Sequence, residues 1–158
     1  MTSLNEKSMH FNGSLKKKFD GGDLTNDAGL LLYKEFDEKV GLSRLIQSSV
    51  FPNDPVNHSV HTNDSVIMQK IYQHIGGDYA DNHADTLRYN PALTTILGKK
   101  SLASQPTMSR VNQLFDKKAT KQLQSVNKVM NECFHSIAPP ENMIFDLDST
   151  NAATYGNQ

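Results

Sequence analysis

The sequence has a single cysteine, Cys133, among its 158 residues. One cysteine excludes an internal disulfide framework and a cysteine-based zinc cluster, and it suits the reducing cytoplasm. No apolar run approaches the roughly 18 residues of a membrane span, and the polar N-terminus lacks the apolar core of a secretion signal. Apolar residues make up only 37% of the chain, yet this is enough for one folded domain. We therefore expect a polar, folded, cytoplasmic protein without a membrane partner.

An overall excess of positive charge is also absent, because the formal net charge is −1. That value alone does not indicate a nucleic-acid partner. The charges are, however, unevenly distributed along the chain. Residues 20–85 carry eleven acids and four bases, whereas residues 99–128 carry seven bases and one acid. This asymmetry allows a local basic face on a nearly neutral protein.

Capping residues and apolar residues at helical spacing predict a mainly α-helical chain. The expected helices run from a cap at Thr25 or Asn26 to Gly41, from a cap at Ser43 to Val50, from a cap at Thr62, Asn63 or Asp64 to Gly76, from Asp81 to Arg88, from Asn90 to Gly98, from Ser104 to Phe115, and from about Ala119 to His135. In the last of these, we expect an apolar face toward the core, made of Leu123, Val126, Val129, Met130 and Phe134. Pro139 and Pro140 then break the helical pattern.

A convincing strand follows this break, and it ends in two acids, Asp146 and Asp148. Side chains alternate along a strand, so the two carboxylates share one face, roughly 7 Å apart. Carboxylates at a strand end are natural ligands for Mg²⁺, and in two-metal phosphoryl chemistry they help to hold the ions. The alternative is a strand that ends in a turn with solvated acids. We predict an extended arm at residues 1–23, a helical domain at 24–138 and a strand within 141–158.

The strand motif also resembles the Asp-x-Asp-x-Thr motif of haloacid-dehalogenase-like phosphatases. In that family Asp146 would be the nucleophile that forms an aspartyl-phosphate, and Asp148 would be the general acid or base. The family also requires a lysine and a further acidic pair downstream, and the chain ends first. Its motif usually opens a domain, whereas here it follows a helical one.

A second resemblance covers nearly the whole chain from about residue 15, and it rests on several motifs in a fixed order. These motifs are Leu24-Thr-Asn-Asp-Ala-Gly-Leu-Leu-Leu32, Phe36-Asp-Glu-Lys-Val-Gly-Leu42, Gln69-Lys-Ile-Tyr-Gln73, Gly77-Asp-Tyr-Ala-Asp-Asn-His-Ala-Asp-Thr-Leu-Arg88, Asn90-Pro-Ala-Leu93, Leu102-Ala-Ser-Gln-Pro-Thr-Met-Ser-Arg110, Asp146-Leu-Asp-Ser-Thr150 and Tyr155-Gly-Asn-Gln158. Together they resemble the N-terminal part of DDE transposases of insertion sequences, the 1380 group.

This resemblance implies a helical N-terminal domain followed by the first β-strand of a ribonuclease-H-like α/β catalytic domain. It also implies Mg²⁺ or Mn²⁺ as cofactor, transposon-end DNA as substrate, and DNA strand cleavage followed by strand transfer. It is compatible with a homo-oligomer. The first catalytic acid and metal ligand is assigned to Asp148, with Asp146 as the competing candidate. Because the chain ends ten residues after Asp148, we expect a truncated catalytic domain that is inactive alone.

The segment Ser104-Gln-Pro-Thr-Met-Ser-Arg110 resembles the start of a recognition helix in helix-turn-helix proteins. Polar side chains at such a helix start reach bases and phosphates. The candidate DNA contacts are Gln105, Thr107, Ser109, Arg110, Lys117 and Lys118. The alternatives are an ordinary capped helix with a solvated basic surface, or a small non-enzymatic helical DNA-binding module.

Overall fold

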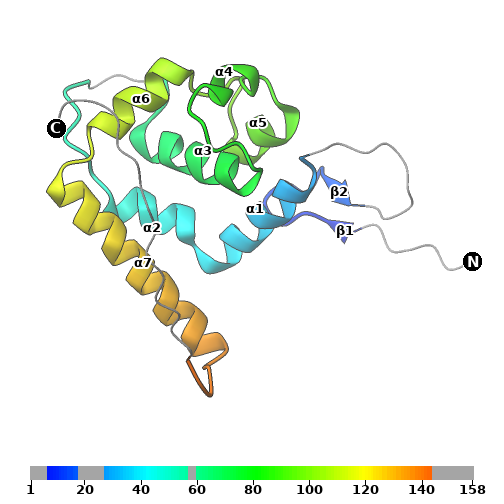
Figure 1. Cartoon of the computed structure of the whole chain (residues 1–158). Helices are drawn as coiled ribbons and strands as arrows, with labels where there is room; N and C mark the ends of the chain where they lie inside the picture. Colours follow the sequence, from blue (N-terminus) through cyan, green and yellow to red (C-terminus); the bar gives the residue numbers. More distant parts are fainter. Residues whose placement is uncertain (1–6, 18–26, 57–59, 144–158) are drawn as a thin grey trace, which may run out of the picture.

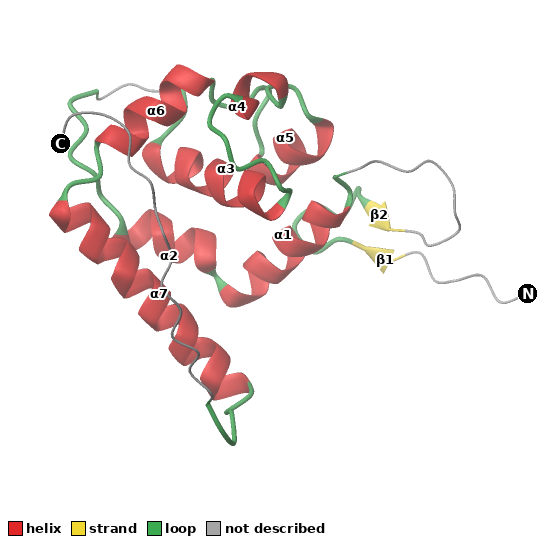
Figure 2. Cartoon of the chain, viewed as in Figure 1, coloured by secondary structure: helices red, strands yellow, loops and turns green. Residues whose placement is uncertain are grey.

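The computed structural model describes residues 7–17, 27–56 and 60–143. Seven helices dominate these ranges, and two short strands precede them (Figure 2). The expected mainly helical chain is confirmed. The expected strand that ends in Asp146 and Asp148 begins beyond Met143 and therefore lies outside the described residues, as do parts of the expected arm at 1–23.

The described part of the N-terminal arm is a hairpin. Strand β1 (Lys7–Ser8) pairs antiparallel with β2 (Lys16–Lys17). The backbone N–H of Met9 donates to the carbonyl of Leu15 at 2.9 Å, and the backbone N–H of His10 donates to the carboxylate of Glu35 on the first helix. The first bond closes the hairpin, and the second attaches it to α1 of the helical body, on the side opposite the last helix (Figure 1).

The helices end largely where their stop residues predict. They are α1 (Gly29–Val40), α2 (Leu42–Ser49), α3 (Asn63–Ile75), α4 (His83–Thr86), α5 (Pro91–Leu97), α6 (Gln105–Gln113) and α7 (Lys117–Ile137). Helix α5 follows the expected pattern closely. The side chain of Asn90 accepts a hydrogen bond from the N–H of Leu93, and Gly98 adopts the left-handed conformation at the C-terminal end, where glycine has no steric penalty.

Four helix starts differ from the sequence prediction. Helices α1 and α4 begin later than expected, at Gly29 and His83, and the differences at α2 and α7 have a clear physical cause. Ser43 does not cap α2, because Gly41 (φ +79°) ends α1 and immediately begins α2. The N–H of Ser43 instead donates to Asp37 at 2.8 Å. Helix α7 begins two residues earlier than expected, because Asp116 is its cap and accepts from the N–H of Ala119 at 2.7 Å. In both cases a carboxylate satisfies a backbone N–H that the first turn leaves without an intrahelical partner.

Two apolar clusters form the core of the described chain. The larger one joins α1, α2, α3, α5 and α7, with Ile46 and Leu93 each only 1% exposed. The smaller one lies between α3, α4 and α6, and includes Val66, Met108 and Val111. Figure 1 shows α3 between α6 on one side and α2 on the other, so that α3 contributes to both clusters. None of the helices in the described ranges is both long and apolar enough to cross a membrane.

Gln69 on α3 connects the two clusters through two hydrogen bonds to the backbone of one residue, of which it donates one and accepts the other. Its side chain is 2% exposed, its Nε2 donates to the carbonyl of Ala103 at 3.0 Å, and its Oε1 accepts from the N–H of the same residue at 2.8 Å. Ala103 is fully buried in the segment that leads into α6. Since buried backbone groups need partners, this amide holds the start of α6 against α3.

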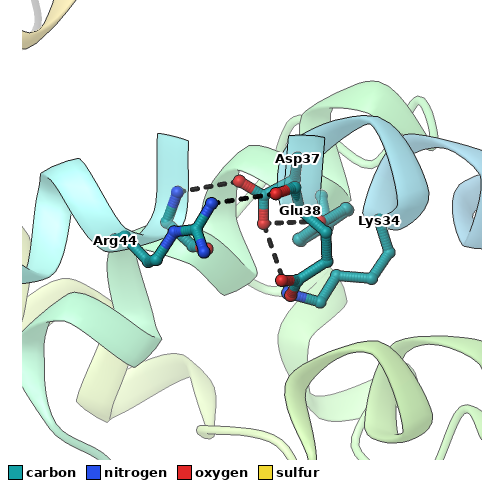
Figure 3. A network of polar contacts seen from close by, with 6 residues as sticks. Lys34, Asp37, Glu38 and Arg44 are labelled. Carbon is teal, nitrogen blue, oxygen red and sulfur yellow. Dashed lines mark hydrogen bonds and ion pairs between the residues drawn. The ribbon is translucent and has the colours of Figure 1, made fainter. Parts of the chain in front are cut away.

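Asp37 forms a second buried polar centre, at the joint between α1 and α2 (Figure 3). It is 4% exposed, and it accepts from the N–H of Ser43, from Nζ of Lys34 at 3.3 Å and from the hydroxyl of Tyr72 at 3.4 Å. Burial is the main cause of a raised pKa for Tyr72, and the negative charge of Asp37 is the second. The hydroxyl therefore stays protonated and available as a donor. The network therefore ties α1, α2 and α3 together.

Candidate nucleic-acid interface

Helix α6 carries the expected contacts Gln105, Thr107, Ser109 and Arg110, but their side chains or backbone groups bind within the protein. Nε2 of Gln105 lies 2.9 Å from the hydroxyl of Ser109, and the hydroxyl of Thr107 lies 3.3 Å from that of Ser104. The backbone N–H of Gln105 donates to Asp85 at 3.0 Å. These contacts order the first turn of α6 and place an acid beside it.

Arg110 is held by an ion pair with Asp54, 56 positions earlier in the chain. The Nη1–Oδ2 distance is 2.7 Å, and the carboxylate side chain is only 10% exposed. The hydrogen bond from Arg110 is the main cause of a lowered pKa for Asp54, and a bond from the N–H of Val56 is the second. The carboxylate therefore stays charged well into the acidic range. A phosphate that reached Arg110 would have to compete with this carboxylate.

A third carboxylate, Asp81, supports the C-terminal end of α6. It accepts from Nδ2 of Asn112 at 2.8 Å and from Nζ of Lys70 on α3 at 2.7 Å. The described surroundings of α6 thus include three acids, at Asp54, Asp81 and Asp85. Such acids disfavour the close approach of a polyanion.

The first two turns of α7 have the opposite character. Lys117, Lys118 and Lys121 are exposed and line an open hollow together with Gln122 and Ser125. Within the described residues, no ion pair involves any of the three lysines. We call the surface of these five residues the α7 basic surface. Gln122 and Ser125, which the motif analysis did not single out, follow Lys118 and Lys121 by four positions each, and this helical spacing is the signal that places them there.

The helix itself adds to the positive potential of the α7 basic surface. The N-terminus of an α-helix carries a partial positive charge and N–H groups without intrahelical partners. Acids usually occupy the first turn for this reason, yet α7 has lysines there and no acid. Asp116 caps only the N–H of Ala119 among the described hydrogen bonds. An anion at this position would meet three lysine charges and the helix terminus, and the single carboxylate of Asp116 offsets only part of this positive charge.

The predicted DNA contacts therefore form two separate groups, one on α6 and one at the start of α7. Gln105 begins α6 and Gln113 ends it, so the helix spans about 12 Å between them at 1.5 Å per residue. Lys117 and Lys118 begin α7 beyond that far end. The loop of residues 51–56 touches both helices, because the N–H of Phe51 donates to Oε1 of Gln122 at 3.0 Å and Asp54 pairs with Arg110.

A further group of cations lies near His61. Burial lowers the pKa of His61, and the charges of Lys99 and Arg88 lower it further. Nζ of Lys99 also donates to the carbonyl of Val60 at 3.5 Å. The depressed pKa keeps His61 neutral at physiological pH, so the positive charge of this group comes from the lysine and the arginine.

A metal centre is not found within the described ranges, where no three His, Cys, Asp or Glu side chains are grouped to hold an ion. Asp146 and Asp148 lie outside the described residues, so the structure does not place them.

Comparison with known families covers almost the entire chain. The family model described as Transposase DDE domain group 1 matches residues 7–158. Neither the curated proteins nor the solved structures include a match to the chain. The family match favours a transposase over the phosphatase alternative. With residues 7–158 matched, the chain belongs to the DDE-domain transposases.

Proposed function

We propose that this chain is the DNA-associated helical part of an insertion-sequence transposase of the 1380 group, and that the α7 basic surface binds the DNA backbone. The observation that carries the proposal is the set of three exposed lysines at the start of α7, none of which has an ion-pair partner among the residues that the structure describes. Family membership supplies the partner, because DNA is the substrate of transposases. Lysines bind phosphate as point charges, so this contact positions DNA without reading its sequence.

Replacing Lys117 and Lys118 with glutamine is expected to weaken DNA binding and to flatten its salt dependence. Each lost phosphate contact reduces the slope of log K against log salt concentration by about 0.9, so the double variant should lose about two units of slope. Fluorescence anisotropy of a labelled duplex across a salt series measures both quantities. The matched control replaces two exposed lysines on other parts of the chain, Lys39 on α1 and Lys100 in the segment before α6.

An unchanged slope in the Lys117/Lys118 variant, or an equal loss in the control, would show that the α7 basic surface does not bind DNA. Arg110 is a poorer probe because its replacement also leaves the nearly buried carboxylate of Asp54 without its ion-pair partner. A loss of binding in an Arg110 variant would therefore mix a DNA contact with a change in the fold.

For chemistry, the proposal assigns Asp148 as a ligand of Mg²⁺ or Mn²⁺, with Asp146 as the competing candidate. Support comes from the family match and from the sequence pattern, since hard oxygen ligands at a strand end suit these ions. When bound, the metal would polarise the scissile phosphate and activate water. The single cysteine agrees with a cytoplasmic location for this reaction.

Calorimetric titration with Mn²⁺ is expected to show weak binding that Asp148→Asn removes. Binding should be weak because two carboxylates alone supply few of the six oxygen ligands that such ions prefer. The control is Glu132→Gln, which removes an acid that is 66% exposed on α7. Binding that survives in Asp148→Asn but disappears in Asp146→Asn would transfer the role to Asp146, and binding that survives in both would reject the site.

A further inference from the structure

The segments on either side of α5 gather two cations beside the start of α3. Arg88 lies three residues before α5, and Lys99 lies two residues after it. Nζ of Lys99 donates to the carbonyl of Val60 at 3.5 Å, and the carbonyl of Arg88 accepts from the backbone N–H of Leu102 at 2.9 Å. His61 follows Val60 directly in the chain. We call His61, Arg88 and Lys99 the α5 cationic cluster.

The positive charge of this cluster is not neutralised by an ion pair within the described ranges. Neither Arg88 nor Lys99 takes part in one there. The guanidinium of Arg88 lies over the exposed ring of Tyr89, 5.8 Å from its centroid, and this contact orders the arginine without removing its charge. Like charges that are held close together repel each other, so an anion that binds between them would stabilise the folded chain.

Two acids lie in the same segments, and neither is paired with the cluster in the described part of the chain. Asp85, three residues before Arg88, accepts from the backbone N–H of Gln105 at 3.0 Å. Asp64 lies in the first turn of α3, three residues after His61. The charges that act on the imidazole of His61 come from the two cations, so positive potential dominates around this ring.

His61 gives the cluster a charge that depends on a proton. Burial is the main cause of its lowered pKa, and the charges of Lys99 and Arg88 lower it further. The imidazole of the free chain is therefore neutral at physiological pH. An anion beside the two cations offsets their charge and so raises the pKa of His61 again. Binding then draws a proton onto the ring, and three charges hold the anion instead of two.

Phosphate is the anion whose chemistry these three groups match. Arginine binds its oxygens through two parallel N–H bonds, lysine binds them as a point charge, and protonated histidine donates an N–H. The cluster is open to solvent at Arg88 and Tyr89, which are exposed, so a phosphate within a long polymer can reach it. The aromatic ring beside the arginine also suits a nucleic acid, because bases stack on such rings. These features favour a DNA phosphodiester over a small free anion.

We propose that the α5 cationic cluster is a second phosphate site, which binds a DNA phosphodiester through Arg88 and Lys99 and places one proton on His61 in doing so. The inference rests on the proposed function for its partner, DNA, but not on the α7 basic surface. The two surfaces are separate, because Lys99 precedes the start of α6 and Lys117 follows its end. In Figure 1, α6 lies between α5 and the start of α7. One surface can therefore be removed while the other stays intact.

Calorimetric titration of the full chain with a short duplex, in two buffers that differ in ionisation enthalpy, counts the protons taken up on binding. At about pH 6.5, where histidine ordinarily titrates, the unmodified chain should take up protons. His61→Asn should take up about one proton fewer per bound chain. The matched control is His135→Asn, which replaces an exposed histidine near the end of α7 and should behave like the unmodified chain.

Replacing Arg88 and Lys99 with glutamine should reduce the slope of log K against log salt concentration by about two units, since each phosphate contact contributes about 0.9. It should also abolish the proton uptake that depends on His61. The matched control replaces Arg44 and Lys100, an exposed arginine and an exposed lysine outside the cluster. Circular dichroism checks the fold. If the double variant is unfolded, Lys99→Gln alone serves instead, with an expected loss of about one unit of slope.

Three results would overturn the inference: proton uptake that His61→Asn leaves unchanged, a salt slope that the loss of Arg88 and Lys99 leaves unchanged, or inorganic phosphate that binds as tightly as the duplex. The last result would assign the cluster to a free anion. The Lys117/Lys118 variant separates this inference from the proposed function, because it should lose its own share of the slope and keep the proton uptake. An unchanged slope in that variant alone would reject the α7 basic surface and leave the α5 cationic cluster as the DNA contact.

Discussion

Replacing Gln69 with leucine is expected to lower the free energy of unfolding by about 2–5 kcal/mol. Leucine has a similar volume, so the loss comes from hydrogen bonding rather than from a large cavity. The change removes the hydrogen-bond acceptor of the Ala103 N–H and the donor to the Ala103 carbonyl, and both of these backbone groups are fully buried. Each unsatisfied buried group costs about 1–3 kcal/mol. Urea denaturation followed by circular dichroism measures the effect, with an unchanged m-value as evidence of two-state unfolding.

Gln73 provides the matched control, because it lies one turn further along α3 and is equally buried at 2% exposure. Its Nε2 has no hydrogen-bond partner among the described residues. Gln73→Leu should therefore cost less than about 1 kcal/mol, since it also removes a buried donor that is unsatisfied. If both variants lost the same stability, the cost would belong to the shape of leucine at these positions and not to the bonds with Ala103.

Asp37→Ala is expected to destabilise the fold by about 2–4 kcal/mol. The change leaves the N–H of Ser43, the hydroxyl of Tyr72 and the ammonium of Lys34 without their shared acceptor. Lys34 keeps a second partner, Glu38, at 2.5 Å, which limits the loss. The main consequence falls on the α1–α2 joint, where the carboxylate takes the place of a capping side chain. Chemical denaturation at neutral pH measures the change.

Two further variants separate the contributions at this joint. Tyr72→Phe removes only the longest of the three bonds, at 3.4 Å, and should cost less than about 1 kcal/mol. Asp37→Asn keeps an oxygen for Ser43 but loses the charge that faces Lys34, so its stability should lie between those of the other two variants. A larger loss for Tyr72→Phe than for Asp37→Ala would contradict this description of the network.

Local sequence signals predicted much of the helical framework. Asn90 and Gly98 bound α5 as expected, and Gly41 ends α1, because caps and left-handed glycines act through bonds to residues a few positions away. The start of α2 was mispredicted because Asp37, six residues from Ser43, supplies the acceptor. A sequence rule that assigns the helix cap to the nearest hydroxyl residue does not find a carboxylate that takes this role from an earlier helix.

The prediction that Val129 and Phe134 face the core was wrong, since they are 46% and 38% exposed. Helical periodicity identifies the apolar face of α7, but it does not tell how far the neighbouring helices extend along that face. The DNA contacts show a similar limit. The positions of Lys117 and Lys118 on the helix could be predicted from the local sequence. The ion pair of Arg110 could not, because it joins residues 56 positions apart and depends on the tertiary fold. The assignment of Asp146 and Asp148 stays a prediction.

The packing of α7 against α2 has a consequence for synthesis of the protein on the ribosome. Phe51, just after α2, bonds to Gln122 on α7, 71 positions later. The larger core cluster takes Ile46 from α2 and Val126 and Met130 from α7. Domains usually fold as units as the chain emerges, but here α1 and α2 must wait for almost the whole helical region before their apolar faces are covered. The emerging N-terminal half therefore exposes apolar surface until α7 leaves the exit tunnel, which makes it a natural client for chaperones.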